Sequence, residues 1–112
     1  MNREIKFRGY SEELKSFVYG FFQEVEAEGV GYSYIFWQGN TTYVRADSVA
    51  QFTGMYDKNG KEIYEGDILF HNLQGNRKVY YPFNQDSAIY GMENLENGMK
   101  SYLVNSHLYE LR

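Results

Sequence analysis

Four dipeptides built from glycine and asparagine divide this 112-residue chain, and each lies between apolar or aromatic runs. They are Gly39-Asn40, Asn59-Gly60, Gly75-Asn76 and Asn97-Gly98. Glycine and asparagine tolerate the positive φ angles that tight hairpin turns require. The pattern therefore predicts four β-hairpins, or about eight short strands.

The composition also favours β structure. Twelve Tyr, eight Phe and one Trp make up 19% of the residues, and aromatic side chains are favoured in strands. Apolar residues alternate beside the first turn, at Tyr32, Tyr34 and Phe36 before it and at Tyr43 after it. Alternation of this kind is typical of half-buried strands. We expect a mainly β fold, α+β at most.

One segment, residues 11–28, fits two structures. As a helix it would be capped by Ser11 and would carry an amphipathic stripe. As a strand its centre is Phe17-Val18-Tyr19-Gly20-Phe21-Phe22, which is aromatic and β-branched, and Gly20 would weaken a helix by about 1 kcal/mol relative to Ala. Periodicity and composition leave both structures open. If the segment is a strand, residues 24–31 form a solvated acidic hairpin or loop.

Two other regions limit the strand assignment. Pro82 cannot donate a hydrogen bond to a ladder, so the strand that includes residues 79–83 lies at a sheet edge or ends there. Residues 100–112 fit either a strand or a short helix.

The sequence carries no motif for catalysis or metal binding. The absence of Cys excludes disulfides and thiolate sites, and the two histidines, His71 and His107, lack the spacing of a zinc site. The segment Asp57-Lys58-Asn59-Gly60 has the oxygen ligands of a calcium loop, but its Gly stands at the fourth position instead of the sixth. We predict no cofactor, no metal site and no enzymatic activity. A dispersed active site around Asp67 and His71 is the enzyme alternative.

Charge and hydropathy bear on partners and location. The net charge is −4 and the pI about 5.1, and the chain has no cluster of Lys and Arg that would mark a binder of the nucleic-acid backbone. No apolar run reaches the roughly 18 residues that span a bilayer, and the N-terminus lacks the apolar segment of a signal peptide. We expect a cytoplasmic protein with no membrane partner.

The tyrosines supply a candidate binding surface. Tyr32, Tyr34 and Tyr43 are spaced to share one sheet face across the hairpin, and Trp37 lies near the hairpin tip as a candidate anchor. Tyr and Trp are favoured in interfaces. We predict that these residues form a contact with a second copy or another protein. Two alternatives stay open: half-buried faces that simply accept Tyr, and stacking of single-stranded nucleic acid.

A block of 19 residues, Gln51-Phe52-Thr53-Gly54-Met55-Tyr56-Asp57-Lys58-Asn59-Gly60-Lys61-Glu62-Ile63-Tyr64-Glu65-Gly66-Asp67-Ile68-Leu69, resembles the signature segment of the YopX family of phage and prophage proteins. Ile5-Lys6-Phe7-Arg8-Gly9 is similar to the opening strand of that family, and Phe17-Val18-Tyr19-Gly20 to a second strand. Residues 105–112 depart from the family pattern. The family-motif turn residues are Gly54, Asp57, Asn59, Gly60, Tyr64, Gly66 and Asp67.

The physics of the block gives it a structural role. Residues 57–61 have the composition of a hairpin loop. Gly66 suits a positive φ at a second turn, and Asp67 can accept backbone N–H bonds across that turn.

The resemblance implies a strand at residues 17–22 and a small SH3-like β-barrel with additional N-terminal strands. It implies a phage or prophage origin and a bacterial cytoplasmic setting, but no particular activity. We expect one domain over residues 1–112, with an N-terminal strand and hairpin region at 1–49 and the SH3-like barrel region at 50–112. The predicted function is an accessory protein that binds itself or a host or phage protein. The alternatives are a nucleic-acid-binding barrel and the dispersed enzyme.

Overall fold

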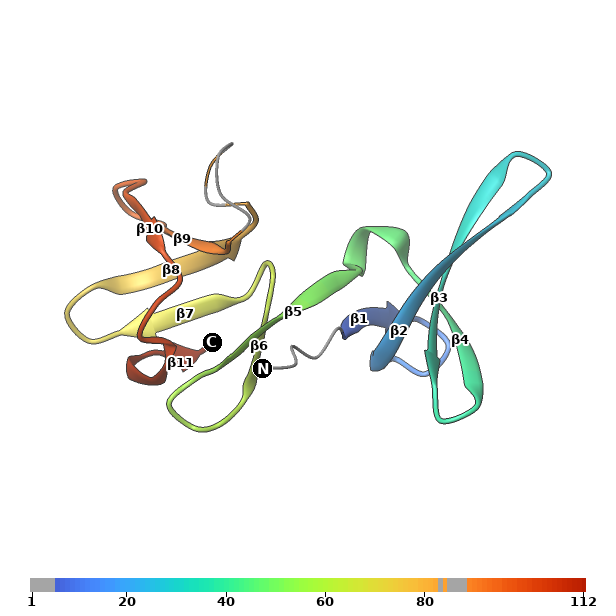
Figure 1. The fold of residues 1–112 in the computed structure, drawn as a ribbon, viewed down its shortest axis with the longest axis horizontal. Helices are drawn as coiled ribbons and strands as arrows, with labels where there is room; N and C mark the ends of the chain where they lie inside the picture. The colour runs from blue at the N-terminus through green and yellow to red at the C-terminus, as the bar shows by residue number, and fades with distance from the viewer. Residues whose placement is uncertain (1–5, 83, 85–88) are drawn as a thin grey trace. The chain divides into compact units, whose positions relative to one another are not determined.

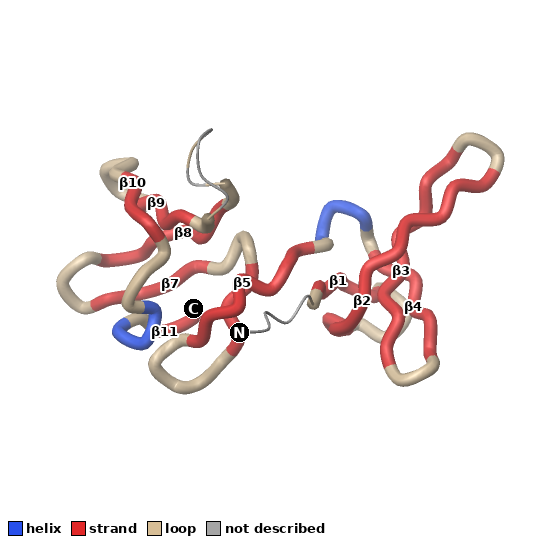
Figure 2. The backbone as a smooth tube through the Cα atoms, viewed as in Figure 1, coloured by secondary structure: helices blue, strands red, loops and turns tan. Residues whose placement is uncertain are grey.

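A computed structural model describes residues 6–82, 84 and 89–112, and this part of the chain is mainly β (Figures 1 and 2). It contains eleven strands and two short 3₁₀ turns, and no α-helix occurs in it. Ile5 and Phe83, which the sequence placed in strands, lie outside the described residues. The chain divides into two compact units, unit 1 (Met1–Phe52) and unit 2 (Thr53–Arg112), which we describe separately.

Unit 1 is an antiparallel sheet with the strand order β4-β3-β2-β1, and the first residues of β5 pair with β1. Its elements are β1 (Phe7–Ser11), β2 (Ser16–Ala27), β3 (Val30–Trp37), β4 (Asn40–Val44), η1 (Ala46–Ser48) and the start of β5 (Ala50–Tyr56). The segment with two possible structures is therefore a strand. The acidic hairpin expected after it is also confirmed, because β2 pairs with β3 up to Ala27 and Val30.

The sheet of unit 1 curls so that the end of β4 contacts β1. The Arg45 N–H donates to the Tyr10 carbonyl over 3.0 Å. A Cβ added to Gly9 would lie 2.7 Å from Cγ2 of Val44, so only glycine permits this approach. Ile35 and Val44, each 1% exposed, form the core inside the curl.

Unit 2 contains the rest of β5, its neighbour β6, and a five-stranded antiparallel sheet with the order β10-β9-β8-β7-β11. Its elements are β6 (Glu62–Tyr64), β7 (Ile68–His71), β8 (Gly75–Tyr80), β9 (Gly91–Asn94), β10 (Lys100–Tyr102), η2 (Ser106–Leu108) and β11 (Glu110–Leu111). The mainly β class is confirmed. In the described residues neither sheet closes, so the SH3-like barrel is not confirmed. A single domain with regions 1–49 and 50–112 stays a prediction.

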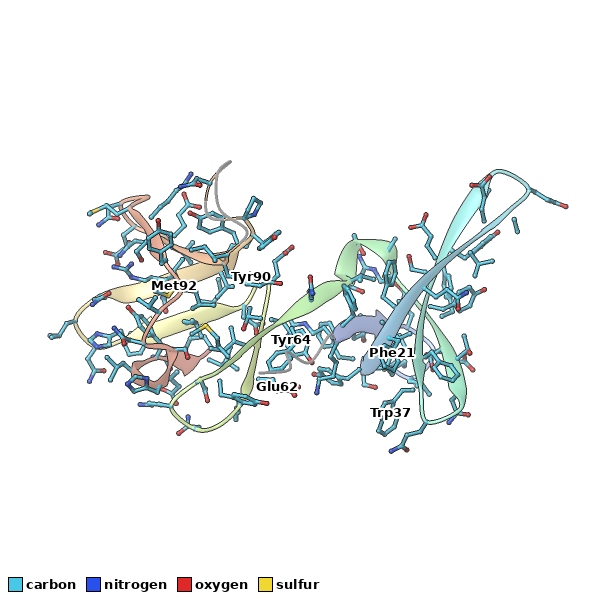
Figure 3. The ribbon with its side chains drawn as sticks, in the orientation of Figure 1. Phe21, Trp37, Glu62, Tyr64, Tyr90 and Met92 are labelled. Atoms are coloured by element: carbon cyan, nitrogen blue, oxygen red, sulfur yellow. The ribbon has the colours of Figure 1, made fainter. Side chains whose placement is uncertain are left out.

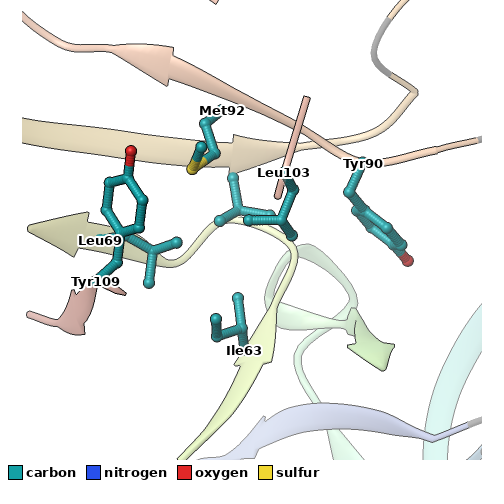
Figure 4. Packing of buried hydrophobic residues seen from close by; sticks show 7 residues of the cluster. Ile63, Leu69, Tyr90, Met92, Leu103 and Tyr109 are labelled. Carbon is teal, nitrogen blue, oxygen red and sulfur yellow. The ribbon is translucent and has the colours of Figure 1, made fainter. Parts of the chain in front are cut away.

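Seven buried side chains form the core of unit 2 (Figure 4). Leu69 and Val79 come from the adjacent strands β7 and β8, and Ile63 comes from β6; all three are fully buried. The other members are Tyr90, Met92, Leu103 and Tyr109. Strand residues that alternate with these point away from the core, as Ile68 and Phe70 do on either side of Leu69.

All four predicted turns connect consecutive strands: β3 to β4, β5 to β6, β7 to β8 and β9 to β10. The strand count exceeds the expected eight because other turns use different residues. Glu28 and Gly29 join β2 to β3 with φ angles of 53° and 80°, which suits a tight hairpin although no Asn is present. Strand β8 ends at Tyr80, two residues before Pro82. Of the two predicted alternatives, a strand at a sheet edge or a strand that ends near Pro82, the second is confirmed.

Candidate functional site

The pairing register of unit 1 sorts its side chains onto two faces. Directly opposed residues of an antiparallel pair share a face, and neighbours along a strand alternate. One face holds the buried residues Ile35 and Val44. The opposite face, which we call the outer aromatic face, carries Tyr10, Phe17, Tyr19, Phe21, Tyr32, Tyr34, Phe36 and Tyr43.

The outer aromatic face is largely exposed. Phe21 on β2 is 64% exposed, its partner Phe36 on β3 is 43% exposed, and Tyr43 on β4 is 55% exposed (Figure 3 shows Phe21). Phe17 and Tyr19 on β2 are also exposed. Contiguous apolar surface of this kind is unusual on a monomeric protein and marks interaction sites.

Contacts between rings hold the side chains in place at the two ends of this face. The Tyr43 ring lies 5.8 Å from Tyr34 and 6.2 Å from Tyr32. At the other end, Tyr10 meets Phe17 edge to face at 5.5 Å, and the Arg8 guanidinium lies 4.9 Å from the Phe17 ring. Such contacts each stabilise by about 1 kcal/mol and hold the rings in place. The face is therefore a preformed surface.

The apolar surface continues onto the β2–β3 hairpin. Residues 25–32, which we call the arm, pair only with each other and extend beyond the other strands of unit 1 (Figure 1). Val25 and Tyr32 oppose each other on the side of the outer aromatic face, whereas Glu24 and Glu26 lie on the other side. A two-stranded ribbon is marginally stable alone. An apolar side on such a ribbon therefore favours docking.

The sequence-predicted tyrosines share one sheet face, whereas the strand register places Trp37 on the opposite face. Tyr32, Tyr34 and Tyr43 share the outer aromatic face. Trp37 opposes Asn40, so the register places it on the other face, where it is 55% exposed. It lines a groove of about 540 Å³ together with Leu14, and Tyr34 and Tyr43 line the same groove.

The sequence reasoning missed five members of this face: Tyr10 on β1, Phe36 on β3, and the β2 residues Phe17, Tyr19 and Phe21. Their alternation at residues 17, 19 and 21 was visible, but the same segment also fitted a helix. Only the strand assignment turns that alternation into one face.

Asp57 joins the β5–β6 loop to the C-terminal strand. Its Oδ1 accepts the N–H groups of Asn59 and Lys61 at 2.8 and 2.9 Å, and its Oδ2 accepts that of Leu111 at 3.1 Å. Burial favours a raised pKa, but the three N–H donors outweigh it and lower the pKa of Asp57 below its ordinary value. Gly60 completes the loop with a φ of 77°. These contacts are structural.

The other motif residues also shape the backbone of unit 2. Asp67 Oδ2 accepts the N–H of Tyr64 at 2.7 Å across the β6–β7 turn, as predicted, and Gly66 in this turn has a φ of 89°. Tyr64 is 1% exposed and donates its hydroxyl to Glu62. Gly54, within β5, has a φ of 86°. The signature block is thus a set of turns and anchors.

Other chemistry is sparse in the described residues. They contain no group of three or more His, Asp or Glu side chains that could hold a metal ion. Asp67 is engaged by its turn, and His71 lies against the Tyr109 ring at 5.3 Å. Within the same described ranges, no helix has the length and apolar character needed to cross a membrane.

The sequence model of the family described as YopX protein matches residues 6–107, nearly the whole chain. No curated protein matches it.

Proposed function

Since this chain belongs to the YopX protein family, we propose that it is a phage- or prophage-encoded accessory protein that acts by self-association in the cytoplasm of a bacterial host. The outer aromatic face and the apolar side of the arm bind the same surface of a second copy. The observation that carries this proposal is the exposed, preformed set of aromatic rings on β2, β3 and β4. No catalytic step belongs to it.

The area of this surface suits a dimer. A buried aromatic side chain contributes roughly 200 Å², and a standard interface buries roughly 800 Å² per partner. From the exposed fractions we estimate roughly 650 Å² of side-chain area on the face and arm. The residues that contribute most are Phe17, Tyr19, Phe21, Val25, Val30, Tyr32, Phe36 and Tyr43.

The placement of charge permits contact between identical faces. The chain is acidic overall, but Glu24 and Glu26 lie on the side of the sheet away from the outer aromatic face. Among the described strand residues of that face, Arg8 carries the one charge. Two such faces can therefore meet without bringing carboxylates together, and one cation is too little for phosphate-backbone binding.

Sedimentation velocity of the full chain tests the proposal. We expect a monomer–dimer equilibrium that Phe21→Gln weakens by at least about tenfold, because a central aromatic anchor typically contributes 2 kcal/mol or more. Leu73→Gln is the matched control, since Leu73 is 90% exposed but lies in unit 2. Circular dichroism establishes that both variants are folded.

Two results would overturn self-association. One is a chain that stays monomeric at roughly 0.5 mM, far above the dissociation constants of specific dimers. The other is a dimer that Phe21→Gln leaves unchanged. A pull-down with and without nuclease then identifies the replacement: a defined protein that survives nuclease indicates another protein partner, and salt-dependent, nuclease-sensitive recovery indicates nucleic acid.

A further inference from the structure

Unit 2 contains a cavity of about 360 Å³ beside its core. Apolar side chains form most of its wall, among them Met92, Val104, Leu108 and Tyr109, and Met92 and Tyr109 belong to the core itself (Figure 4). Ligand sites typically have volumes of roughly 300–1,000 Å³ and are mostly apolar with a few polar groups. The cavity meets both criteria.

One cation lines this apolar wall without a counter-ion. The half-buried Arg77 on β8 donates from Nη1 to Ser101 Oγ over 3.0 Å. Its Nε is buried and has no hydrogen-bond partner among the residues that the structure describes. In the same part of the chain, no carboxylate forms an ion pair with it. An anion in the cavity would supply the counter-charge that the described residues do not give to this guanidinium.

The polar groups around Arg77 are already fixed. The Tyr109 hydroxyl donates to Gln74 Oε1 over 2.7 Å, and the Leu73 N–H donates to Nδ1 of His71 over 3.1 Å. His71 in its neutral form therefore carries its proton on Nε2 and remains a possible donor. These partners occupy the acceptors Gln74 Oε1 and His71 Nδ1. Tyr102 and Asn105, which also line the cavity, can donate as well as accept, so Arg77 supplies its one fixed positive charge. The site favours an acceptor ligand.

We propose that this cavity binds a small organic carboxylate with an apolar body. The carboxylate accepts hydrogen bonds from the Arg77 guanidinium, and the apolar body lies against Met92, Val104 and Leu108. Arginine and carboxylate form short, charge-assisted hydrogen bonds, so this pairing supplies both affinity and orientation. The same chemistry occurs in a free small acid and in the C-terminal residue of a peptide. The site lies within unit 2 and does not depend on self-association through unit 1.

Titration of the full chain with 4-phenylbutyrate, followed by heteronuclear NMR, tests this site. We expect saturable shifts of the Met92, Val104 and Leu108 methyl groups and of Arg77 Nε–H, with a dissociation constant on the order of 1 mM for so small a ligand. The neutral amide 4-phenylbutyramide should bind at least about tenfold more weakly because it lacks the charge. Acetyl-Ala-Ala-Leu with a free carboxylate separates the two sources. Binding of this peptide assigns a peptide terminus, whereas binding of phenylbutyrate alone assigns a free acid.

Two variants attribute the binding to Arg77. Arg77→Gln should weaken phenylbutyrate binding at least about tenfold. Lys78→Gln makes the same charge change at the exposed neighbouring residue of β8 and should leave binding unchanged. If Arg77→Gln fails to fold, Val104→Trp fills the cavity from an exposed wall position and should abolish the shifts.

Three results would overturn the site: no saturable shift at roughly 10 mM ligand, equal binding of acid and amide, or unchanged binding in folded Arg77→Gln or Val104→Trp. A repeat titration in the Phe21→Gln variant keeps this result separate from self-association. If the Phe21→Gln variant is monomeric and still binds the ligand, binding in the cavity is independent of self-association.

Discussion

Unit 1 and unit 2 are both built from short antiparallel strands rich in aromatic residues, but they place those residues differently. In unit 2, Tyr90 and Tyr109 are at most 7% exposed and belong to the buried apolar cluster, and Tyr64 is 1% exposed. In unit 1, the buried apolar residues are the aliphatic Ile35 and Val44 and one aromatic residue, Phe52, while Phe21 and its aromatic neighbours face outward. Aromatic content therefore indicates how much sheet a chain forms. The pairing register determines whether that content builds a core or a binding surface.

The loops of the two units differ in the same way. In unit 2, Asp57 and Asp67 bond backbone N–H groups across turns and join segments distant in sequence, such as Asp57 and Leu111. In unit 1, the β2–β3 and β3–β4 connections are tight turns that rely on positive φ angles at Gly29 and Gly39. Unit 1 has one comparable anchor, because Ser48 Oγ accepts the Tyr10 N–H over 2.8 Å. It differs from unit 2 mainly in the aromatic rings that its sheet leaves exposed.

The largest effect is expected from removing the central anchor of unit 2. Asp57→Ala leaves three backbone N–H groups without their acceptor, so the free energy of unfolding should fall by about 3 kcal/mol. Amide hydrogen exchange in β6, β7 and β8 measures the loss within unit 2 itself. Asp47→Ala is the control, because Asp47 is exposed and bonds Arg45, and it should change stability by less than about 1 kcal/mol. Equal effects of the two variants would refute the anchoring role.

A smaller effect should test the close packing of unit 1. A Cβ at Gly20 would collide with the carbonyl oxygen of Phe36, so Gly20→Ala must displace β3 and should cost about 2 kcal/mol. The single tryptophan, Trp37, lies beside Gly20 and reports the unfolding midpoint by fluorescence. In Gly31→Ala the new Cβ meets only the flexible end of Glu24, at 3.3 Å, and stability should stay within about 0.5 kcal/mol. If Gly20→Ala left the free energy of unfolding unchanged, strands β2 and β3 would be less closely packed than described.

A milder effect is expected when the Asp57 carboxylate is titrated. Its pKa is lowered in the folded state, so the unfolded state binds a proton first as the pH falls. The stabilisation is present above the unfolded pKa of about 3.9 and is lost as the pH drops through the folded pKa. Urea unfolding between roughly pH 6 and pH 3 should show this loss in unit 2. Asp57→Asn should flatten the pH dependence, and an unchanged slope in that variant would assign it to other carboxylates.

The sequence predicted the local features of the fold well because turns depend on residues close together. Asn59-Gly60 and Asn97-Gly98 mark hairpins through the φ angles that Gly60 and Gly98 adopt. The β2–β3 hairpin followed from the sequence only if residues 11–28 formed a strand, because Glu28 occupies a position where Asn would have been a direct turn signal. Whether the sheets close is decided by long-range pairing, such as that of β7 with β11, which no local pattern encodes.

The candidate site could be predicted only in part, for a related reason. Tyr34 and Tyr43 lie symmetrically about their turn, so their pairing follows from a short hairpin. Trp37 lies three residues after Tyr34 on the same strand. Because side chains alternate along a strand, this odd spacing already implies that the two point to opposite faces. For Phe17 to Phe21, helix and strand periodicities competed. In the strand, Gly20 permits the close approach of Phe36, and this tertiary contact is not visible in the local sequence.

The smallest effect is the sharpest test of the two-faced sheet. Phe21 and Phe22 are neighbours on β2, but Phe22 packs on Phe7 with ring centroids 5.6 Å apart, whereas Phe21 is 64% exposed. Phe21→Thr should therefore change the stability of the monomer by no more than about 0.5 kcal/mol, since an exposed strand position tolerates Thr. Phe22→Thr removes an inward ring and should cost roughly 2 kcal/mol. Both are measured by Trp37 fluorescence in urea, at concentrations low enough to keep the chain monomeric. A large loss in Phe21→Thr would show that the outer rings support the fold of unit 1 itself, and the distinction between a binding surface and a core would then fail for this unit.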